Sequence, residues 1–442
     1  MAASPARIAA YDILLRVERE GAYANELLHS ALLNKLSAAD RGLCTEIVMG
    51  VLRWRARLDY ATEQLASRAV ERLDLEVLIA LRMGLYQIQW LERVPARAVV
   101  NESVELVKRA RKRSAVAFAN AVLRKAKPGS VEVPPAHDAA SLALEWSHSE
   151  WLVERWVREY GFDVARAICE FDQRVPETVV RVADDAAERE LIESGVSLTR
   201  GRLVSRARIV ERGEVGKTRA FRESRVHFQD EGSQLVALLV GRGQRVLDCC
   251  AAPGGKTMVM AERNPEAEIL AAELHEHRAR SLSQRVHAKN VSVMTADVRD
   301  LPVSADYDRV LADVPCSGTG TLARNPEIKW KLNARDLDEL HGKQVQILRS
   351  ALRQVRVGGR AVYSTCSLER EECESVVEEV ISEQNEFRTV PVQEQLGALQ
   401  AEGEIIGNFG MLVRGDYLRT IPGIHHCDGF FAAVIERRNQ QT

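Results

Sequence analysis

Apolar side chains recur every three to four positions through residues 5–127, as Ile8, Tyr11 and Leu15 show near the start. This spacing places the apolar positions on one face of a helix, whereas a half-buried strand would alternate them every second residue. The pattern therefore predicts an all-α domain over residues 1–130.

The helical pattern stops at KPGSVEVPPAHD, residues 127–138, where three prolines and a glycine predict a linker. Residues 140–230 then predict a linking subdomain of mixed structure, with short strand-like runs between polar turns. Its tryptophans, Trp146, Trp151 and Trp156, are five residues apart, which does not keep them on one helix face. We interpret them as packing residues at a domain junction rather than as a platform for stacked bases.

From about residue 230 the pattern changes to strand, loop and helix, repeated. The short apolar runs are residues 245–249, 268–272, 291–294, 309–312 and 360–364, with a last one at 429–437. Strands that alternate with helix-length segments predict a parallel, doubly wound sheet. We therefore expect a multidomain chain in which residues 231–442 form a Rossmann-like α/β domain.

The composition is that of an ordinary globular protein, with 46% hydrophobic and 28% charged residues among 442. Single hydrophobic cores stop growing at about 250–300 residues, so this length calls for more than one domain. No apolar run approaches the roughly 20 residues that a membrane-spanning helix needs. The N-terminal segment also becomes charged too early for a signal peptide. We expect a cytoplasmic protein with no membrane association.

Eight cysteines are few for this length, and none belongs to a Cys-x-x-Cys pair. A disulfide framework and a zinc finger are both disfavoured, and we predict no metal site. A buried free cysteine usually behaves as a small hydrophobic residue. We give this interpretation to Cys44, Cys169, Cys249, Cys373 and Cys427.

The net charge of −2 conceals an asymmetry between the two parts of the chain. Residues 1–130 carry 21 Lys plus Arg against 14 Asp plus Glu, or +7, which leaves −9 for the remainder. A dense basic stretch, residues 108–113, lies near the end of the helical region. Contact with a polyanion such as RNA is one explanation, and a solvated helix surface is the other.

The segment VLDCCAAPGGKT, residues 246–257, predicts a strand, a turn of small residues and a helix that begins near Lys256. Such a turn lets a ligand approach the backbone and directs free N–H groups towards it. A phosphate-binding P-loop would require glycine at position 250, where this chain has Cys250. The turn therefore indicates a ligand site of another kind, or a tight turn without a ligand.

Three acids stand at successive strand ends: Glu273, Asp297 and Asp313. The carboxyl ends of parallel strands face one crevice, so we expect these acids to line it with the turn at residues 251–256. An acid after the second strand suits two ribose hydroxyls. Any one of them alone could serve as a helix cap, but three in register favour a shared site.

Two cysteines lie in the loops just after the fourth and fifth predicted strands, in DVPCSGTG (Cys316) and YSTCSLEREECE (Cys366). We expect these strands to be neighbours, about 4.8 Å apart, which would bring both sulfurs into one site. Carbon 5 of cytosine is too weak a nucleophile to be methylated directly, whereas a thiolate that adds to carbon 6 activates it. A second thiol can then assist release of the product, and Asp313 is placed to stabilise the ring. Spacing alone does not decide which thiol attacks.

These segments, with FQDEGSQLVA at residues 228–237, together resemble the RNA cytosine-5 methyltransferase family. DRGLCTEIVMGVLRWRARLD at 40–59 and FANAVLR at 118–124 are similar to the NusB-type RNA-binding domain. This pairing is characteristic of the bacterial RsmB/Sun (Fmu) branch, which modifies 16S rRNA. The resemblance implies a multidomain protein with an all-α NusB-like domain and a Rossmann-like methyltransferase domain.

The resemblance also implies a cofactor and roles for particular residues. S-adenosylmethionine is the implied cofactor, Cys366 the implied nucleophile, and Cys316 the thiol that helps release the product. DNA cytosine-5 methyltransferases instead attack with the cysteine after the fourth strand. The residues expected to contact the cofactor are Cys250, Ala251, Ala252, Pro253, Gly254, Gly255, Lys256, Glu273, Asp297 and Asp313.

We expect a monomer whose partner is RNA, with 16S rRNA as the first choice of substrate. Transfer RNA is the alternative substrate for the same reaction. The alternative of a different class is a non-catalytic NusB-like RNA-binding or antitermination factor, which would need neither Cys316 nor Cys366.

Overall fold

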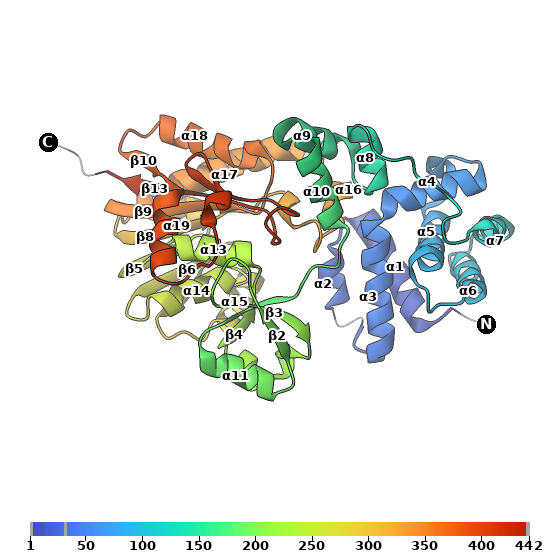
Figure 1. The fold of residues 1–442 in the computed structure, drawn as a ribbon, viewed down its shortest axis with the longest axis horizontal. Coiled ribbons are helices and arrows are strands. Elements are labelled where there is room, and N and C mark those ends of the chain that lie inside the picture. The colour runs from blue at the N-terminus through green and yellow to red at the C-terminus, as the bar shows by residue number, and fades with distance from the viewer. Residues whose placement is uncertain (1–2, 31–32, 439–442) are drawn as a thin grey trace. The chain divides into compact units, whose positions relative to one another are not determined.

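The computed structural model describes residues 3–30 and 33–438, and its ribbon is drawn in Figure 1. The chain folds into two compact units. Unit 1 comprises Met1–Val175 with Leu322–Leu332, and unit 2 comprises Pro176–Thr321 with Asn333–Thr442. Within the described ranges, no helix is long and apolar enough to cross a membrane.

The described part of unit 1 contains helices and no strand, in agreement with the period of its apolar residues. Its first helices are α1 (Pro5–Glu20), α2 (Ala24–Leu28), α3 (Ala38–Arg53), α4 (Arg55–Ala66), α5 (Leu75–Trp90), α6 (Ala96–Arg109) and α7 (Val116–Lys125). Helix α5 contacts α1, α3, α4, α6 and α7, and every residue from Val77 to Ile88 is buried. A helix buried on all sides is the centre of a helical core.

The rest of unit 1 comes from two separate parts of the chain. After the proline-rich segment come α8 (Ala139–Glu145), α9 (Glu150–Tyr160) and α10 (Phe162–Asp172), and α16 (Ile328–Lys331) is contributed from far along the sequence. Trp156 is buried, and Trp146 packs 6.4 Å from Trp54, measured between ring centroids. Trp146 and Trp156 are therefore packing residues in this unit.

The segment Leu322–Leu332 is tied to the helical unit by buried hydrogen bonds. Lys329 Nζ donates to Arg53 O and to Ser147 O, both at 2.9 Å, and Trp330 Nε1 donates to Leu52 O at 2.7 Å. Lys329 is 1% exposed, and burial lowers its pKa to about 7. Because this segment directly follows the loop of Cys316 in the chain, the loop leads covalently into unit 1.

Unit 2 begins with a small antiparallel sheet of order β2-β3-β1-β4. Its strands are β1 (Val179–Val182), β2 (Ser197–Arg200), β3 (Ala207–Arg212) and β4 (Val226–Phe228), and its helices are α11 (Asp185–Glu193) and α12 (Arg219–Arg222). Val180, Val182 and Val226 pack against Leu191 of α11 and Ala220 of α12. Figure 1 shows β2, β3, β4 and α11 grouped together.

The second sheet of unit 2 has the order β11-β12-β13-β9-β8-β5-β6-β7, with β10 paired to β13. Its strands are β5 (Arg245–Asp248), β6 (Glu268–Glu273), β7 (Val291–Thr295), β8 (Tyr307–Asp313), β9 (Val355–Thr365), β10 (Phe387–Val390), β11 (Val413–Arg414), β12 (Tyr417–Thr420) and β13 (Phe430–Arg437). Strands β5 to β9 pair in parallel, as predicted. Strand β13 instead pairs antiparallel with both β12 and β9. The loop between β12 and β13 is short and holds no crossover helix, so the chain reverses direction there.

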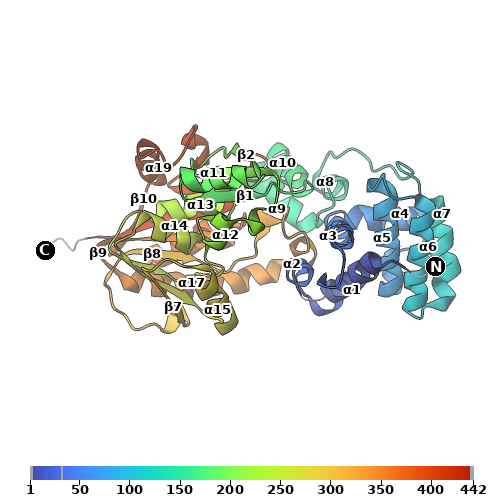
Figure 2. The same cartoon turned by 90° about the horizontal axis from the view of Figure 1, so that it is seen from below.

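Helices cover both faces of this sheet. They are α13 (Glu231–Leu239), α14 (Gly255–Arg263), α15 (Glu276–Arg285), α17 (Ala334–Gln354), α18 (Glu374–Ser382) and α19 (Val392–Ala401). Val246 and Leu311 face the core with α13, α14 and α19, whereas the adjacent Leu247 and Val310 face α17 and α18. Figure 2 shows α13 and α14 on one side of the sheet and α17 on the other. The fold is therefore doubly wound, with the carboxyl ends of its parallel strands at one edge.

Candidate functional site

The turn between β5 and α14 is fixed to the strands on both sides of β5. Cys249 donates its N–H to Leu311 O at 2.8 Å, and Ala251 donates to Ala272 O at 2.9 Å. Gly254 has a φ of +109°, and a Cβ atom there would lie 2.7 Å from Leu282 Cδ1. The turn residues therefore form one continuous wall: Cys250, Ala251, Ala252, Pro253, Gly254, Gly255 and Lys256.

The three predicted acids lie at the carboxyl ends of parallel strands. Glu273 ends β6 and Asp313 ends β8, while Asp297 follows β7 and caps the next turn. Glu273 is 3% exposed, and its Oε1 accepts from His275 N at 3.1 Å, whereas its Oε2 has no hydrogen-bond partner among the described residues. Asp297 differs, because Arg299 binds both of its oxygens and these hydrogen bonds lower the pKa of Asp297.

Two cavities open beside these groups. The first, of about 510 Å³, is the strand-end cavity. Of the predicted site residues it is lined by Cys250, Ala252, Glu273, Asp297, Asp313, Cys316 and Cys366. The second, of about 670 Å³, is the turn cavity. Of the predicted site residues it is lined by Cys250, Ala251, Ala252, Pro253, Gly254, Gly255, Lys256 and Asp313.

The sequence predicted one crevice for the acids and the turn, and in the structure these residues line two adjoining cavities. Cys250, Ala252 and Asp313 line both cavities, so the two spaces meet at the turn and at Asp313. Lys256 lines only the turn cavity, whereas Glu273 and Asp297 line only the strand-end cavity.

Cys316 and Cys366 lie together at the ends of adjacent strands. Strands β8 and β9 are parallel neighbours, which confirms the predicted adjacency of the two motifs. The two Sγ atoms are 3.3 Å apart. The hydrogen bond with Cys366, burial, and the nearby carboxylates of Glu372 and Asp313 raise the pKa of Cys316 well above its usual value. Cys316 therefore keeps its proton at neutral pH.

Lys256 supplies positive charge beside the two thiols. Its Nζ donates to Asp313 Oδ2 at 2.7 Å, and Ser364 Oγ donates to Asp313 Oδ1 at 2.6 Å. Burial acts to lower the pKa of Lys256, but the charges of Asp313 and Cys366 raise it, so the ammonium persists at neutral pH. The ammonium of Lys256 and the thiol of Cys316 thus both lie close to the sulfur of Cys366.

Glu372 joins the two cysteine-bearing loops, although no motif in the sequence marks it as a site residue. Its Oε1 accepts from Ser317 N at 2.8 Å and from Gln344 Nε2 at 2.9 Å. Its Oε2 accepts from Ser367 Oγ at 2.5 Å and from Ser317 Oγ. Because Ser317 follows Cys316 and Ser367 follows Cys366, one buried carboxylate fixes the spacing of the two loops. In sequence, Glu372 looks like one more acid of an exposed run, LEREECE.

The basic stretch at residues 108–113 is partly neutralised by its own unit. Lys108 pairs with Glu105 at 2.7 Å, Arg109 with Asp12 at 2.6 Å, and Lys112 with Asp74 at 3.1 Å. Arg111 and Arg113 are exposed and have no ion-pair partner within the described part of the chain. Three of the five basic side chains in this stretch are thus held in local ion pairs.

The other cysteines that we interpreted as small hydrophobic residues are all buried: Cys44, Cys169, Cys249, Cys373 and Cys427. Over residues 3–30 and 33–438, no cluster of three or more His, Cys, Asp or Glu residues could hold a metal ion.

A doubly wound sheet with a small-residue turn after one strand and an acid at the end of its neighbour is typical of Rossmann-like, S-adenosylmethionine-dependent methyltransferases, and the fold and site define this class. A family model described as 16S rRNA methyltransferase RsmB/F matches residues 235–436, and a NusB family model matches residues 4–128. The chain belongs to the RsmB/F methyltransferase family and carries an N-terminal NusB domain.

Relatives match along nearly the whole chain. The Bacillus subtilis protein named "Probable ribosomal RNA small subunit methyltransferase B" is 32% identical, covering 97% of this chain and 98% of that protein. The ribosomal RNA small subunit methyltransferase B of Pseudomonas putida is 31% identical, with coverages of 90% and 93%.

Two solved structures share the fold. The crystal structure of PH0851 has a TM-score of 0.78 at 23% sequence identity and covers 99% of this chain and 100% of its own. A methyltransferase homolog protein from Pyrococcus horikoshii has a TM-score of 0.56 at 24% identity, with coverages of 69% and 100%.

Proposed function

We propose that this protein transfers the methyl group of S-adenosylmethionine to carbon 5 of a cytosine in 16S rRNA through a covalent bond between Cys366 and carbon 6. The observation that carries the proposal is the thiol pair, with Sγ atoms 3.3 Å apart, in the cavity that also contains Glu273. Methylation of a nucleophilic nitrogen or oxygen needs no such pair, whereas carbon 5 requires activation by a thiolate.

The strand-end cavity suits the cofactor in size and in chemistry. Its volume of about 510 Å³ falls in the usual range for small-molecule sites. The Oε2 atom of Glu273 is available to accept from a ribose hydroxyl, and Val298 and Ile347 add apolar surface. S-adenosylmethionine bound there supplies an electrophilic methyl group for carbon 5.

Of the residues expected to contact the cofactor, five line this cavity: Cys250, Ala252, Glu273, Asp297 and Asp313. The others shape the turn that presents Cys250 and Ala252, namely Ala251, Pro253, Gly254, Gly255 and Lys256. The guanidinium of Arg299 already binds both carboxylate oxygens of Asp297. We therefore propose that Asp297 and Arg299 contact the cofactor together.

Cys366 is the nucleophile in this proposal. Its thiolate adds to carbon 6, so that carbon 5 becomes an enamine carbon, and the ammonium of Lys256 and the thiol of Cys316 lie beside the attacking sulfur. Asp313, held between Lys256 and Ser364, lies where a carboxyl group can contact the ring nitrogen of the cytosine.

Cys316 assists release of the product. The carbon 5 proton must leave, and the bond between Cys366 and carbon 6 must break, before the RNA can depart. Cys316 lies within hydrogen-bond distance of Cys366, and Glu372 holds its loop in place. It is therefore positioned to donate its S–H to the sulfur of Cys366 as the bond to carbon 6 breaks, while the carbon 5 proton passes to solvent.

One observation favours 16S rRNA as the substrate, and two favour RNA in general. The matching family model and the curated relatives carry that RNA or the small ribosomal subunit in their names. The NusB match covers the part of the chain with a net charge of +7. Arg111 and Arg113 in that part are exposed and available to phosphates.

Labelled methyl transfer to purified 16S rRNA, 23S rRNA and transfer RNA, followed by nucleoside analysis and mapping, tests the proposal. We expect 5-methylcytidine at one position of 16S rRNA, no product with Cys366→Ala, and normal activity with the matched variant Cys44→Ala in the helical unit. Label in transfer RNA would favour the alternative substrate. Label on any atom other than carbon 5, or activity without Cys366, would contradict the mechanism.

A further inference from the structure

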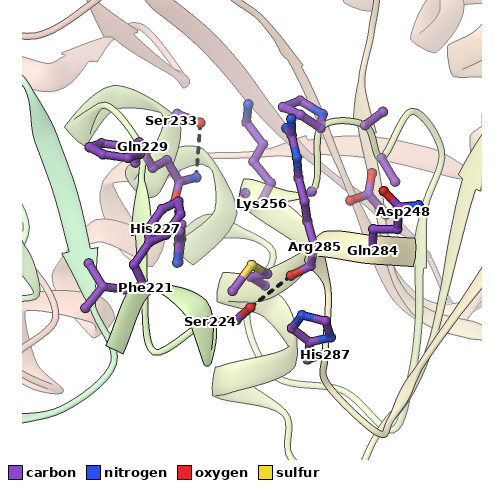
Figure 3. Close-up of a pocket in the computed structure, with 18 of the residues that line it drawn as sticks. Phe221, Ser224, His227, Gln229, Ser233, Asp248, Lys256, Gln284, Arg285 and His287 are labelled. Carbon is purple, nitrogen blue, oxygen red and sulfur yellow. Dashed lines mark hydrogen bonds between the residues drawn. The ribbon is translucent and has the colours of Figure 1, made fainter. Parts of the chain in front are cut away.

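The turn cavity is larger than the strand-end cavity, and only one end of it reaches the catalytic groups. Lys256 and Asp313 line that inner end. The outer end lies between the small sheet, which contributes His227 and Phe228, and α15 with the loop after it, which contributes Arg285 and His287. Figure 3 shows His227 on one side and Arg285 and His287 on the other. Neither the cofactor nor the thiol chemistry accounts for this outer end.

Two guanidinium groups at the outer end have no acidic partner. Arg222 and Arg285 are both exposed, and no carboxylate of the described residues lies within ion-pairing distance of either. Other arginines around α12 are paired, as Arg219 is with Glu223 and Arg225 is with Glu190. Arg222 and Arg285 are therefore available to an anionic ligand, and phosphate matches a guanidinium well.

An aromatic surface stands beside these cations. Phe228, at the end of the edge strand β4, is 50% exposed and lines the cavity. Phe221 supports it, with ring centroids 5.3 Å apart and the planes tilted by 56°. An exposed aromatic ring at the mouth of a cavity offers a stacking surface for a nucleobase.

Neutral polar groups lie deeper in the same space. His227 Nε2 lies 3.0 Å from Gln229 Oε1, and Gln229 Nε2 donates to Ser233 Oγ at 3.1 Å. Burial lowers the pKa of His227 to about 4, so its ring is neutral at physiological pH and contributes hydrogen bonding rather than charge. Exposed Gln284 adds an amide on the opposite side (Figure 3). Such groups can pair with the edge of a base.

We propose that the outer end of the turn cavity is a subsite for a nucleotide that flanks the target cytosine, with its base stacked on Phe228 and its phosphate held by Arg222 and Arg285. The subsite rests on the proposed function. Phe228, Lys256 and Asp313 line one cavity, so a strand whose target cytosine reaches the catalytic groups can place a neighbouring nucleotide at Phe228. It would fix the register of the strand, so that one cytosine faces the thiols.

RNA binding to the full-length protein tests the subsite, with a 16S rRNA transcript as the probe over a range of salt concentrations. Base stacking on an aromatic ring predicts that Phe228→Ala weakens binding roughly 5- to 150-fold, and that Phe228→Trp restores it. Loss of two single-strand phosphate contacts predicts that Arg222→Ala with Arg285→Ala lowers the salt slope by about 1.4.

The controls are Ile192→Ala, an exposed apolar residue of the same subdomain, and Arg206→Ala, which breaks an ion pair away from the cavity. Neither should alter RNA binding. If the wild type methylates the transcript while the Phe228 and arginine variants bind it as the wild type does, the subsite is wrong and the proposed function stands. The subsite is also wrong if Phe228→Ala weakens S-adenosylmethionine binding alone. Failure of the wild type to methylate RNA would overturn the proposed function, and the subsite with it.

Discussion

Replacing Glu372 with alanine removes the acceptor that joins the two cysteine-bearing loops. Four hydrogen bonds end on this carboxylate, two from N–H groups and two from hydroxyls. Glu372 and Ser367 are fully buried, and Ser317 is 9% exposed, so water cannot replace the lost acceptor without rearrangement.

The expected loss of stability follows from those contacts. The two hydroxyls can pair with each other, since Ser317 Oγ and Ser367 Oγ are 3.2 Å apart. The N–H of Ser317 and the amide of Gln344 lose an acceptor, and at roughly 1–3 kcal/mol for each unpaired buried group the cost is about 2–6 kcal/mol. Glu372→Gln keeps one carbonyl oxygen and the shape of the side chain, so we expect it to cost about 1 kcal/mol.

Activity should respond through geometry, because Glu372 touches neither thiol directly. A displacement of about 1 Å between catalytic groups can cost about 10²-fold in rate, so we expect Glu372→Ala to lower kcat by up to that factor and to leave the KM for RNA little changed. Thermal unfolding and steady-state methyl transfer measure the two effects. The matched control is Glu378→Ala, which breaks only an exposed ion pair with Arg370. Wild-type stability and kcat in Glu372→Ala would refute the positioning role.

Three further substitutions test other parts of the account. Glu273→Ala should weaken S-adenosylmethionine binding by about 1–3 kcal/mol in calorimetry, and an unchanged Kd would remove Glu273 from the cofactor site. Lys329→Ala leaves the carbonyls of Arg53 and Ser147 without their donor, so we expect urea titration to show a loss of about 2–6 kcal/mol. Burial raises the pKa of Asp248 to about 7, so the folded protein holds a proton that the unfolded chain releases at lower pH. The stability of the wild type relative to Asp248→Asn should therefore fall by on the order of 3 kcal/mol between pH 5 and 8, and a constant difference would contradict that pKa.

The positions of the strand ends could be predicted from the sequence because each strand is marked by a short run of apolar residues. Short apolar runs separated by helix-length segments define parallel strands, and parallel strands end at a common edge. Glu273, Asp313, Cys316 and Cys366 could thus be expected near one another from the sequence alone. The antiparallel pairing of β13 with its neighbours follows a β12–β13 loop too short for a crossover helix, and the repeated pattern of strands and helices does not reveal this reversal.

Other features depend on contacts between distant parts of the chain. The β5–α14 turn lines both cavities, and its position is fixed by hydrogen bonds to β6 and β8. The segment Leu322–Leu332 packs in the helical unit although its neighbours in sequence belong to unit 2.

The positive charge of residues 1–130 suggests testing RNA binding by deleting them, but the deletion would also deprive Lys329 and Trp330 of hydrogen-bond partners. Point substitutions at Arg111 and Arg113 are the cleaner test of RNA contact.

The assignment of the two thiols is tested most directly by trapping the covalent complex with RNA. Wild type, Cys366→Ala, Cys316→Ala and the double variant are incubated with 16S rRNA and S-adenosylmethionine and run on a denaturing gel. If Cys366 attacks and Cys316 assists release, protein joined to RNA should accumulate only in Cys316→Ala and vanish in the double variant. A stable adduct in Cys366→Ala would reverse the two roles, and no adduct in either single variant would contradict the role in release that we propose for Cys316.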